Sequence, residues 1–246
     1  MATLASADIA MILIGGFDLT GADVRELNWE VEALLDRIDG SGDGFEAWAY
    51  TNQKRGGGSQ KGIFDDAVAH SHAVLSANLG TAPIVLIGRN TIGGICWGFP
   101  AARQVDYQRL MQLGTLHKAE ASYEFSGGAD TQARVLNNKT SRASASGNTD
   151  TTSVNNLGQS TAGGRAYLQV IALSLGGYTS VTIRVRDSAD NVTFANLGSA
   201  FANVTAVNTA QTLDIAGTIR QYTSMSWTFN GAGSGTITPV VALQRF

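Results

Sequence analysis

The stretch from Asn137 to Gly164 limits what this chain can fold into more than any other feature. It reads NNKTSRASASGNTDTTSVNNLGQSTAGG, and its longest apolar side chains are Val154 and Leu157. Such a stretch cannot bury enough apolar surface to offset the entropy lost on ordering it. We therefore expect most of it to be linker or loop, acting as a flexible hinge between two domains.

The composition changes across this stretch. Residues 1–140 hold 11 Lys or Arg against 16 Asp or Glu, and residues 141–246 hold 6 against 4. This balance does not suggest a DNA-coating protein, which would show a concentrated basic face. The sequence predicts a first domain at 1–140, a Ser/Thr/Asn/Gly-rich linker at 141–164 and a C-terminal domain at 165–246, whose first strand can begin from about residue 151.

Alternating side chains predict strands on both sides of the linker. Apolar and acidic residues alternate from Leu27 to Glu32 and again from His117 to Phe125, which predicts two strands with one apolar and one acidic face. Residues 126–128 (SGG) predict a turn, after which Thr131–Leu136 returns as the hairpin partner of the second strand. Short alternating strands after the linker, such as the one with Val181, Ile183 and Val185 inward, predict a jelly-roll or immunoglobulin-type β-sandwich.

The remaining segments of the first half complete a mainly β domain with one flanking helix. Ile9–Ile14 predicts a buried strand, and Ile84–Ile87 a strand that pairs with Thr91–Phe99. Other segments leave alternatives open: 33–38 is a helical turn or part of an irregular region, 51–62 (TNQKRGGGSQKG) a projecting loop or long hairpin, 105–113 a strand or short helix, and 67–77 the best helix, with Asp66 as its cap.

No catalytic or metal-binding signature is complete. Asp39–Gly44 matches the first half of an EF-hand loop, but the glutamate required at position twelve is Tyr50. The Gly-rich segment Arg55–Lys61 lacks the Gly-Lys-Ser/Thr ending of a phosphate loop. We expect no enzyme activity and no cofactor.

The histidines and the cysteine have simple structural interpretations. His70 and His72 do not share a helix face, and His117 is remote in sequence, so we expect exposed polar side chains and no metal site. Cys96 is the only cysteine and lies between Ile95 and Trp97, which predicts an inert buried thiol. The apolar run at the N-terminus is too short to span a bilayer and has no basic residue before it, so we expect neither a signal peptide nor a membrane segment.

The order of several weak motifs resembles the major tail (tail tube) proteins of long, flexible-tailed bacteriophages, with an appended β-sandwich. The segments that carry this resemblance are 16–19 (GFDL), 29–32 (WEVE), 61–66 (KGIFDD) and 117–128 in the first half, and 167–170 (YLQV), 181–191 (VTIRVRDSADN) and 220–229 in the second.

The resemblance implies a structural virion subunit that forms rings, most often hexameric, which stack into a tube that conducts DNA to the host. It implies a tail-tube-type sandwich or barrel, other tail proteins as partners, and a subunit assembled in the host cytoplasm. An acidic strand face suits a channel because it repels DNA phosphates. The candidate channel-facing residues are Glu30, Glu32, Glu120 and Glu124, and the candidate inter-ring loop carries Lys54, Arg55 and Lys61.

Two other interpretations stay open at the level of sequence. The C-terminal sandwich could be a carbohydrate-binding or adhesion module of a virion or cell surface, with Tyr178 and Tyr222 as sugar platforms, although core packing is the simpler role for Tyr222. The four glutamates could instead pair for acid–base chemistry, but a solvated or channel-lining role is simpler on the polar face of a strand.

Overall fold

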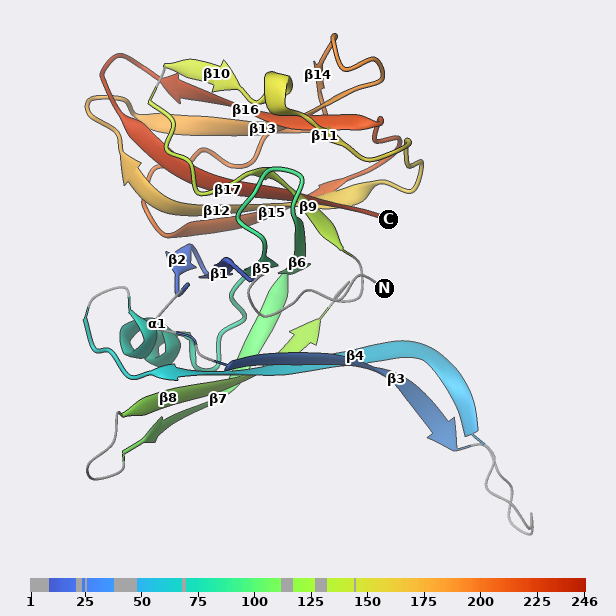
Figure 1. Ribbon diagram of the computed structural model, residues 1–246, viewed down its shortest axis with the longest axis vertical. Coiled ribbons are helices and arrows are strands. Elements are labelled where there is room, and N and C mark those ends of the chain that lie inside the picture. Colours follow the sequence, from blue (N-terminus) through green and yellow to red (C-terminus); the bar gives the residue numbers. More distant parts are fainter. Residues whose placement is uncertain are drawn as a thin grey trace.

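The computed structural model describes residues 9–20, 24, 26–37, 48–67, 70–111, 117–126, 132–143 and 145–246 (Figure 1). Within these residues the chain is mainly β with one α-helix, so the predicted mainly β class is confirmed. The strands form three sheets, of eight, five and four strands, and neighbouring strands in all three are antiparallel.

The eight-stranded sheet runs through the middle of the molecule. Its strands, in spatial order, are β15 (Thr209–Ile215), β12 (Gly164–Ser174), β17 (Thr236–Arg245), β9 (Ala133–Asn137), β6 (Ile95–Phe99), β5 (Val85–Gly88), β1 (Met11–Ile14) and β2 (Phe17–Asp18). All four residues of β1 are buried, as the continuous apolar run predicts. The predicted pairing of 84–87 with 91–99 is also confirmed, as β5 with β6.

The five-stranded sheet covers the C-terminal end of the eight-stranded sheet and completes a β-sandwich (Figure 1). Its strands are β10 (Ser146–Asn148), β16 (Tyr222–Asn230), β13 (Ser180–Ser188) and β14 (Ala195–Asn196), with β11 (Val154–Asn155) also paired to β16. Val181, Ile183 and Val185 point into the core between the two sheets and are fully buried, as their alternation predicts.

The predicted linker is packed against this sandwich. Between Arg142 and Gly164 the chain forms β10, a 3-10 turn (Asp150–Thr152) and β11, so it is not a free hinge. Hydrogen bonds, the close packing of small residues and the buried side chain of Val154 hold it in place. Thr149 exchanges backbone and side-chain hydrogen bonds with Met225, and Gly147 lies so close to the Trp227 indole that a Cβ would fall 2.4 Å from Cζ2.

The four-stranded sheet is a separate layer at the other end of the molecule (Figure 1). Its order is β3 (Glu26–Arg37), β4 (Trp48–Ile63), β8 (Lys118–Ser126) and β7 (Ala101–Leu110). The long-hairpin alternative for residues 51–62 is therefore correct, and the helical turn proposed at 33–38 is wrong over 33–37, which belong to β3. Asp39–Gly44 lies outside the described residues.

Two sequence predictions in this half need correction. Thr131–Leu136 is not the hairpin partner of His117–Phe125: β4 and β7 occupy both edges of β8, and β9 pairs with β6 and β17 in the eight-stranded sheet. The helix α1 (Ser71–Asn78) begins later than predicted, after an N-cap at His70, so Asp66 is not its cap. Val74 and Leu75 of α1 pack into the core between the four-stranded sheet and β1 and β5.

Candidate functional site

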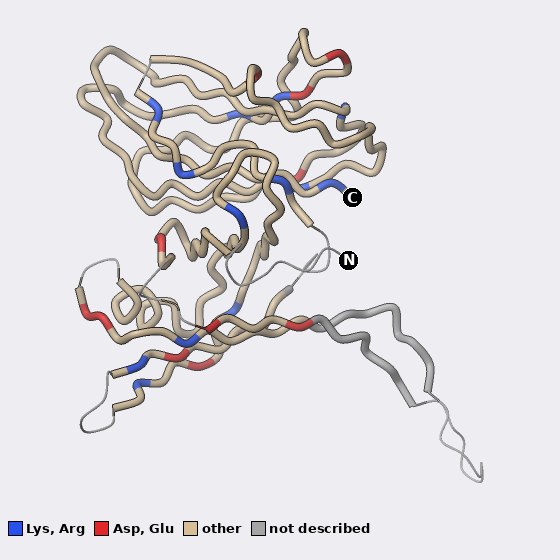
Figure 2. The backbone as a smooth tube through the Cα atoms, in the orientation of Figure 1, with Lys and Arg blue, Asp and Glu red and all other residues tan. Residues whose placement is uncertain are grey.

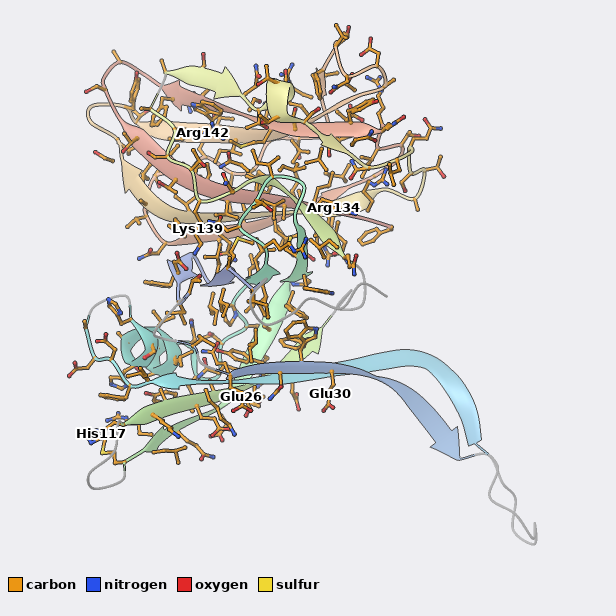
Figure 3. The ribbon with its side chains drawn as sticks, viewed as in Figure 1. Glu26, Glu30, His117, Arg134, Lys139 and Arg142 are labelled. Atoms are coloured by element: carbon orange, nitrogen blue, oxygen red, sulfur yellow. The ribbon has the colours of Figure 1, made fainter. Side chains whose placement is uncertain are left out.

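The four-stranded sheet has one face directed away from the rest of the molecule, and most of the predicted site residues lie on it. Side chains of directly paired residues share a face in an antiparallel sheet. The register aligns Glu30, Gly57, Glu124 and Arg103 in one row across the four strands. Figure 3 shows Glu26 and Glu30 leaving the sheet on the side opposite the body. Glu30 and Glu124 thus flank a glycine that puts no side chain between them.

A second row contains Lys61, which sequence placed in an inter-ring loop. The register aligns Glu26, Lys61, Glu120 and Gln108, and the Lys61 Nζ lies 3.3 Å from Glu120 Oε1. Their side chains are 41% and 24% exposed, so this ion pair contributes at most about 1 kcal/mol. Lys61 therefore lies on a central strand of the sheet, near the strand's end, and offsets part of the acidity of this face.

The face as a whole is acidic and polar. Between the two charged rows lie Asn28, Ser59, Ser122 and Asp106, and Gln108 Nε2 donates to Asp106 Oδ2 at 2.7 Å. Among the described residues that the register places on this face, the acidic ones outnumber the basic ones, and Figure 2 marks the positions of acidic and basic residues along the backbone. The acidic side chains are Glu26, Glu30, Asp106, Glu120 and Glu124, and the basic ones are Lys61, Arg103 and Lys118.

Glu32, Lys54 and Arg55 belong to the part of the hairpin that extends beyond β8. The backbone of Glu32 pairs with Arg55 and that of Ala33 with Lys54, whereas β8 pairs with β4 only from Gly56 onward. Their side chains lie outside the described structure. The structure therefore brings Glu30, Glu120, Glu124 and Lys61 together on one face. The other three predicted residues, Glu32, Lys54 and Arg55, lie in the projecting part of the hairpin.

The opposite face of the sheet packs on the body, and the glycines of β4 make this possible. Ala119, Ala121 and Tyr123 are buried in the shared core. A Cβ at Gly58 would lie 2.7 Å from the Asn28 carbonyl oxygen and 2.9 Å from Cζ of Phe125. The Phe125 ring therefore lies over the glycines of β4 and stacks on Phe99 with ring centroids 4.1 Å apart. The Gly-rich run, which in the sequence indicated a loop or hairpin, belongs to a central strand, where the Phe125 ring leaves little room for larger side chains at Gly56 and Gly58.

The edge strand β7 completes the description of this surface. The outward amides of Ala102 and Gln104 donate to the carbonyls of Pro83 and Thr81, which covers the first part of the β7 edge. Farther along, Val105, Leu110 and Met111 expose 47%, 44% and 60% of their surface. Sequence analysis missed these residues as a site; the signal available to it was large apolar residues among the polar residues of 103–111. An edge strand with exposed apolar side chains along it is a template for pairing with another strand.

The surroundings of His72, His117 and Cys96 are packing contacts and hydrogen bonds. Among the described residues, no group of three or more His, Cys, Asp or Glu could hold a metal ion. His72 Nδ1 lies 2.7 Å from the Tyr107 hydroxyl, and His72 and His117 both pack near the Phe64 ring. Cys96 is fully buried, and burial raises the pKa of its thiol well above the usual value, as an inert thiol requires.

The described helix is also too short to cross a membrane. The two tyrosines considered as sugar platforms are half-buried: the Tyr178 ring packs against Phe229, with centroids 4.8 Å apart, and Tyr222 belongs to β16.

A shallow hollow of about 650 Å³ on the four-stranded sheet is lined by Glu30, Gly57, Val105 and Glu124 among others.

Comparison with known proteins gives only distant likenesses. No family model and no curated protein matches the chain. Among solved structures, it is similar to a chain of the virion of a native gene transfer agent, at 15% identity over 51% of this chain and 96% of the other, with a TM-score of 0.39. It is also similar to Dit of phage SPP1, described as a hub adsorption protein of phages that infect Gram-positive hosts, at 11% identity over 96% and 98%, with a TM-score of 0.34. Likenesses this remote do not establish a common fold or function.

Proposed function

We propose that this protein is a structural subunit of a phage-type tail that joins copies of itself into a closed ring, and that stacked rings form a tube through which DNA passes. The observation that carries the proposal is the four-stranded antiparallel sheet with an exposed polar face, a body on its other face and an edge strand at each side. The proposed role needs no catalytic group and no cofactor.

The number of strands favours ring closure. Because the sheet has four antiparallel strands, β3 and β7 run in opposite directions. Copies related by rotation about an axis along the strands would therefore place β7 of one copy antiparallel to β3 of the next. The strand direction would then alternate without a break around the ring. Strand β3 of the next copy would then lie beside Val105, Leu110 and Met111 and shield part of their exposed surface. Closing a sheet removes its edges altogether.

The same arrangement would direct the polar face inward. The body, including α1 and both faces of the eight-stranded sheet, lies on the other side of the four-stranded sheet (Figure 1). A ring closed through β3 and β7 has room for the body only outside, so the face with Glu30, Glu120 and Glu124 would line the channel. Its acidic excess would repel DNA phosphates and let the duplex slide.

The dimensions are compatible with a channel. Six copies of a four-stranded sheet, with strands spaced about 4.8 Å apart, give a barrel roughly 37 Å across between backbones, and strand tilt widens it further. The hairpin that extends beyond β8 would project toward a neighbouring ring. Lys54 and Arg55 lie in its backbone and are the proposed inter-ring contacts; Lys61, which pairs with Glu120, would belong to the channel wall instead.

The test is assembly of the purified protein with the β7 edge intact or blocked. Negative-stain microscopy and light scattering should show rings or tubes for the wild-type chain. Val105→Lys places a charge on the uncovered edge and should reduce the assembled fraction roughly tenfold, while circular dichroism stays native. Val192→Lys is the matched control, because Val192 is 81% exposed on a remote turn of the sandwich, and it should assemble normally. A wild-type protein that remains a monomer, or a Val105→Lys variant that assembles like the wild type, would contradict the proposal.

A further inference from the structure

A cleft at one end of the sandwich concentrates positive charge away from the four-stranded sheet. The cleft has a volume of about 340 Å³ and lies between β9, the end of β17 and the turn that follows β11. Arg134 of β9 and Arg245 of β17 both line it, and Figure 3 shows Arg134 at the boundary between the sandwich and the rest of the molecule. Arg134 pairs directly with Leu243, so Arg245, two residues farther along β17, lies on the same face.

Both guanidinium groups are held in place by backbone carbonyls. Arg245 donates from Nη1 to the Gly158 oxygen at 2.6 Å and from Nη2 to the Asn156 oxygen at 3.0 Å. Arg134 donates from Nη1 to the Gly93 oxygen at 3.0 Å. A guanidinium has five N–H donors, so each arginine keeps donors that these bonds do not use. The two side chains are thus positioned in advance for a bidentate acceptor.

The charge in the cleft is not balanced by its own lining. Burial lowers the pKa of Arg245, and the positive charge of Arg134 lowers it further, so the two cations are close enough to repel each other. The described residues that line the cleft include no Asp or Glu. An anion placed between the two guanidiniums would relieve this repulsion, and a carboxylate is, with phosphate, one of the two acceptors whose geometry matches a guanidinium fork.

An exposed leucine beside the arginines indicates what carries that carboxylate. Leu157 exposes 89% of its surface and has a φ of 63°, a left-handed conformation that a branched side chain such as leucine rarely adopts. The turn is fixed by side-chain hydrogen bonds: Asn155 Oδ1 accepts from the Leu157 amide at 2.9 Å, and Asn156 Nδ2 donates to Thr223 Oγ1 at 2.9 Å. The fold therefore fixes the backbone of an exposed apolar residue at the rim of a cationic cleft.

We propose that this cleft binds an acidic side chain of a partner polypeptide, with Arg134 and Arg245 on its carboxylate and Leu157 against an apolar residue next to it. An inorganic anion or a nucleic-acid phosphate would use the arginines but would leave Leu157 without a contact. The inference goes beyond ring formation and does not depend on it, because the cleft lies on the sandwich and not on β3 or β7.

Fluorescence anisotropy on the full chain tests this proposal. The probe is a fluorescein-labelled peptide, acetyl-Leu-Glu-Leu-amide with the dye on a C-terminal linker, and the neutral comparison replaces the glutamate with glutamine. The acidic peptide should bind at least about tenfold more tightly than the neutral one. Arg134→Gln and Leu157→Gly should each weaken binding roughly tenfold. Leu157→Gly should stay folded, because glycine adopts this φ freely.

The controls separate this inference from the proposed function. Arg184→Gln, on β13 and outside the cleft, should bind the peptide like the wild type. Val105→Lys should also bind it, so a failure of ring assembly would leave this result intact. Equal binding of the neutral peptide, or full binding by Arg134→Gln, would overturn the proposal. Binding that survives Leu157→Gly and is displaced equally well by inorganic phosphate would overturn it too, since the cleft would then be a site for free anions.

Discussion

At the scale of single residues, the glycines of β4 explain why this segment was difficult to interpret. A run of three glycines between basic residues is typical of a loop, and only the register shows that Gly56 and Gly58 lie beneath the Phe125 ring. We expect Gly58→Ala to destabilise the protein by about 1–3 kcal/mol, because its Cβ would collide with the Asn28 carbonyl and with Phe125. Gly158→Ala, with nothing near the added Cβ, should change stability by less than about 0.5 kcal/mol. Urea denaturation of the two variants measures this difference in unfolding free energy. Equal losses in the two variants would show that the close contact of Gly58 with Phe125 does not decide which residue is tolerated there.

The buried tyrosines give a second prediction at this scale. Burial raises the pKa of Tyr167 from 10.0 to about 12. The native state therefore keeps its phenol proton at pH values where the unfolded chain has lost it, and this part of the stability is fully present below pH 10 and is lost as the pH rises from there toward 12. Burial also raises the pKa of Tyr123, in the same direction. Urea midpoints should be nearly constant from pH 8 to 9 and fall steeply above pH 10, and Tyr167→Phe should make that fall shallower. A midpoint that rises with pH in this range would contradict the assignment.

At the scale of secondary-structure elements, local periodicity predicted strands well but not their partners. The alternation from His117 to Phe125 is sufficient to assign β8 and its two faces, and the apolar runs are sufficient to assign β1 and β5. The nearest candidate partner of β8 in sequence, Thr131–Leu136, instead crosses to another sheet as β9. Pairing depends on contacts far apart in sequence, which a period of two cannot specify.

The candidate site follows the same pattern. Because alternation puts Glu30, Glu120 and Glu124 on polar strand faces, the sequence could predict an acidic surface. It could not predict that these faces belong to one sheet, since that requires β3, β4 and β8 to be neighbours. Nor could it identify Val105 as an exposed residue: the irregular register between Gln104 and Asp106 moves it out of the alternation.

At the scale of the whole molecule, the two halves share both a sheet and a core. β17 pairs with β12 on one side and with β9 on the other, so the eight-stranded sheet crosses the predicted domain boundary. One buried cluster contains Met11, Leu13 and Cys96 from the first half together with Tyr167 and Val240 from the second. A Cβ at Gly98 would fall 2.5 Å from the Tyr167 ring, and the Tyr167 hydroxyl donates to the Gly98 oxygen at 3.0 Å. The two halves are therefore in direct packing and hydrogen-bonding contact at this point.

The shared core affects how the predicted division into domains at 1–140 and 165–246 can be tested. That division stays a prediction, namely that each of the two parts folds independently. In a fragment of residues 1–140, Ala133 and Val135 of β9 would lose the cover of β17, and the exposed edge would favour aggregation. In a fragment of residues 165–246, Tyr167 and Val240 would be exposed on a bare sheet face, at a cost of about 1.5–3 kcal/mol for each large side chain uncovered.

We therefore expect the full chain to unfold in urea in a single transition, seen alike by circular dichroism and tryptophan fluorescence, because a core common to both halves couples their unfolding. Expressed separately, each fragment should be insoluble or should lack a sigmoidal urea transition, whereas co-expression should recover a soluble complex with β9 beside β17. If the 165–246 fragment alone gave a sigmoidal urea transition, with Trp227 as buried as in the full chain, the sandwich would be an independent domain and the shared sheet a docking contact between two folded units.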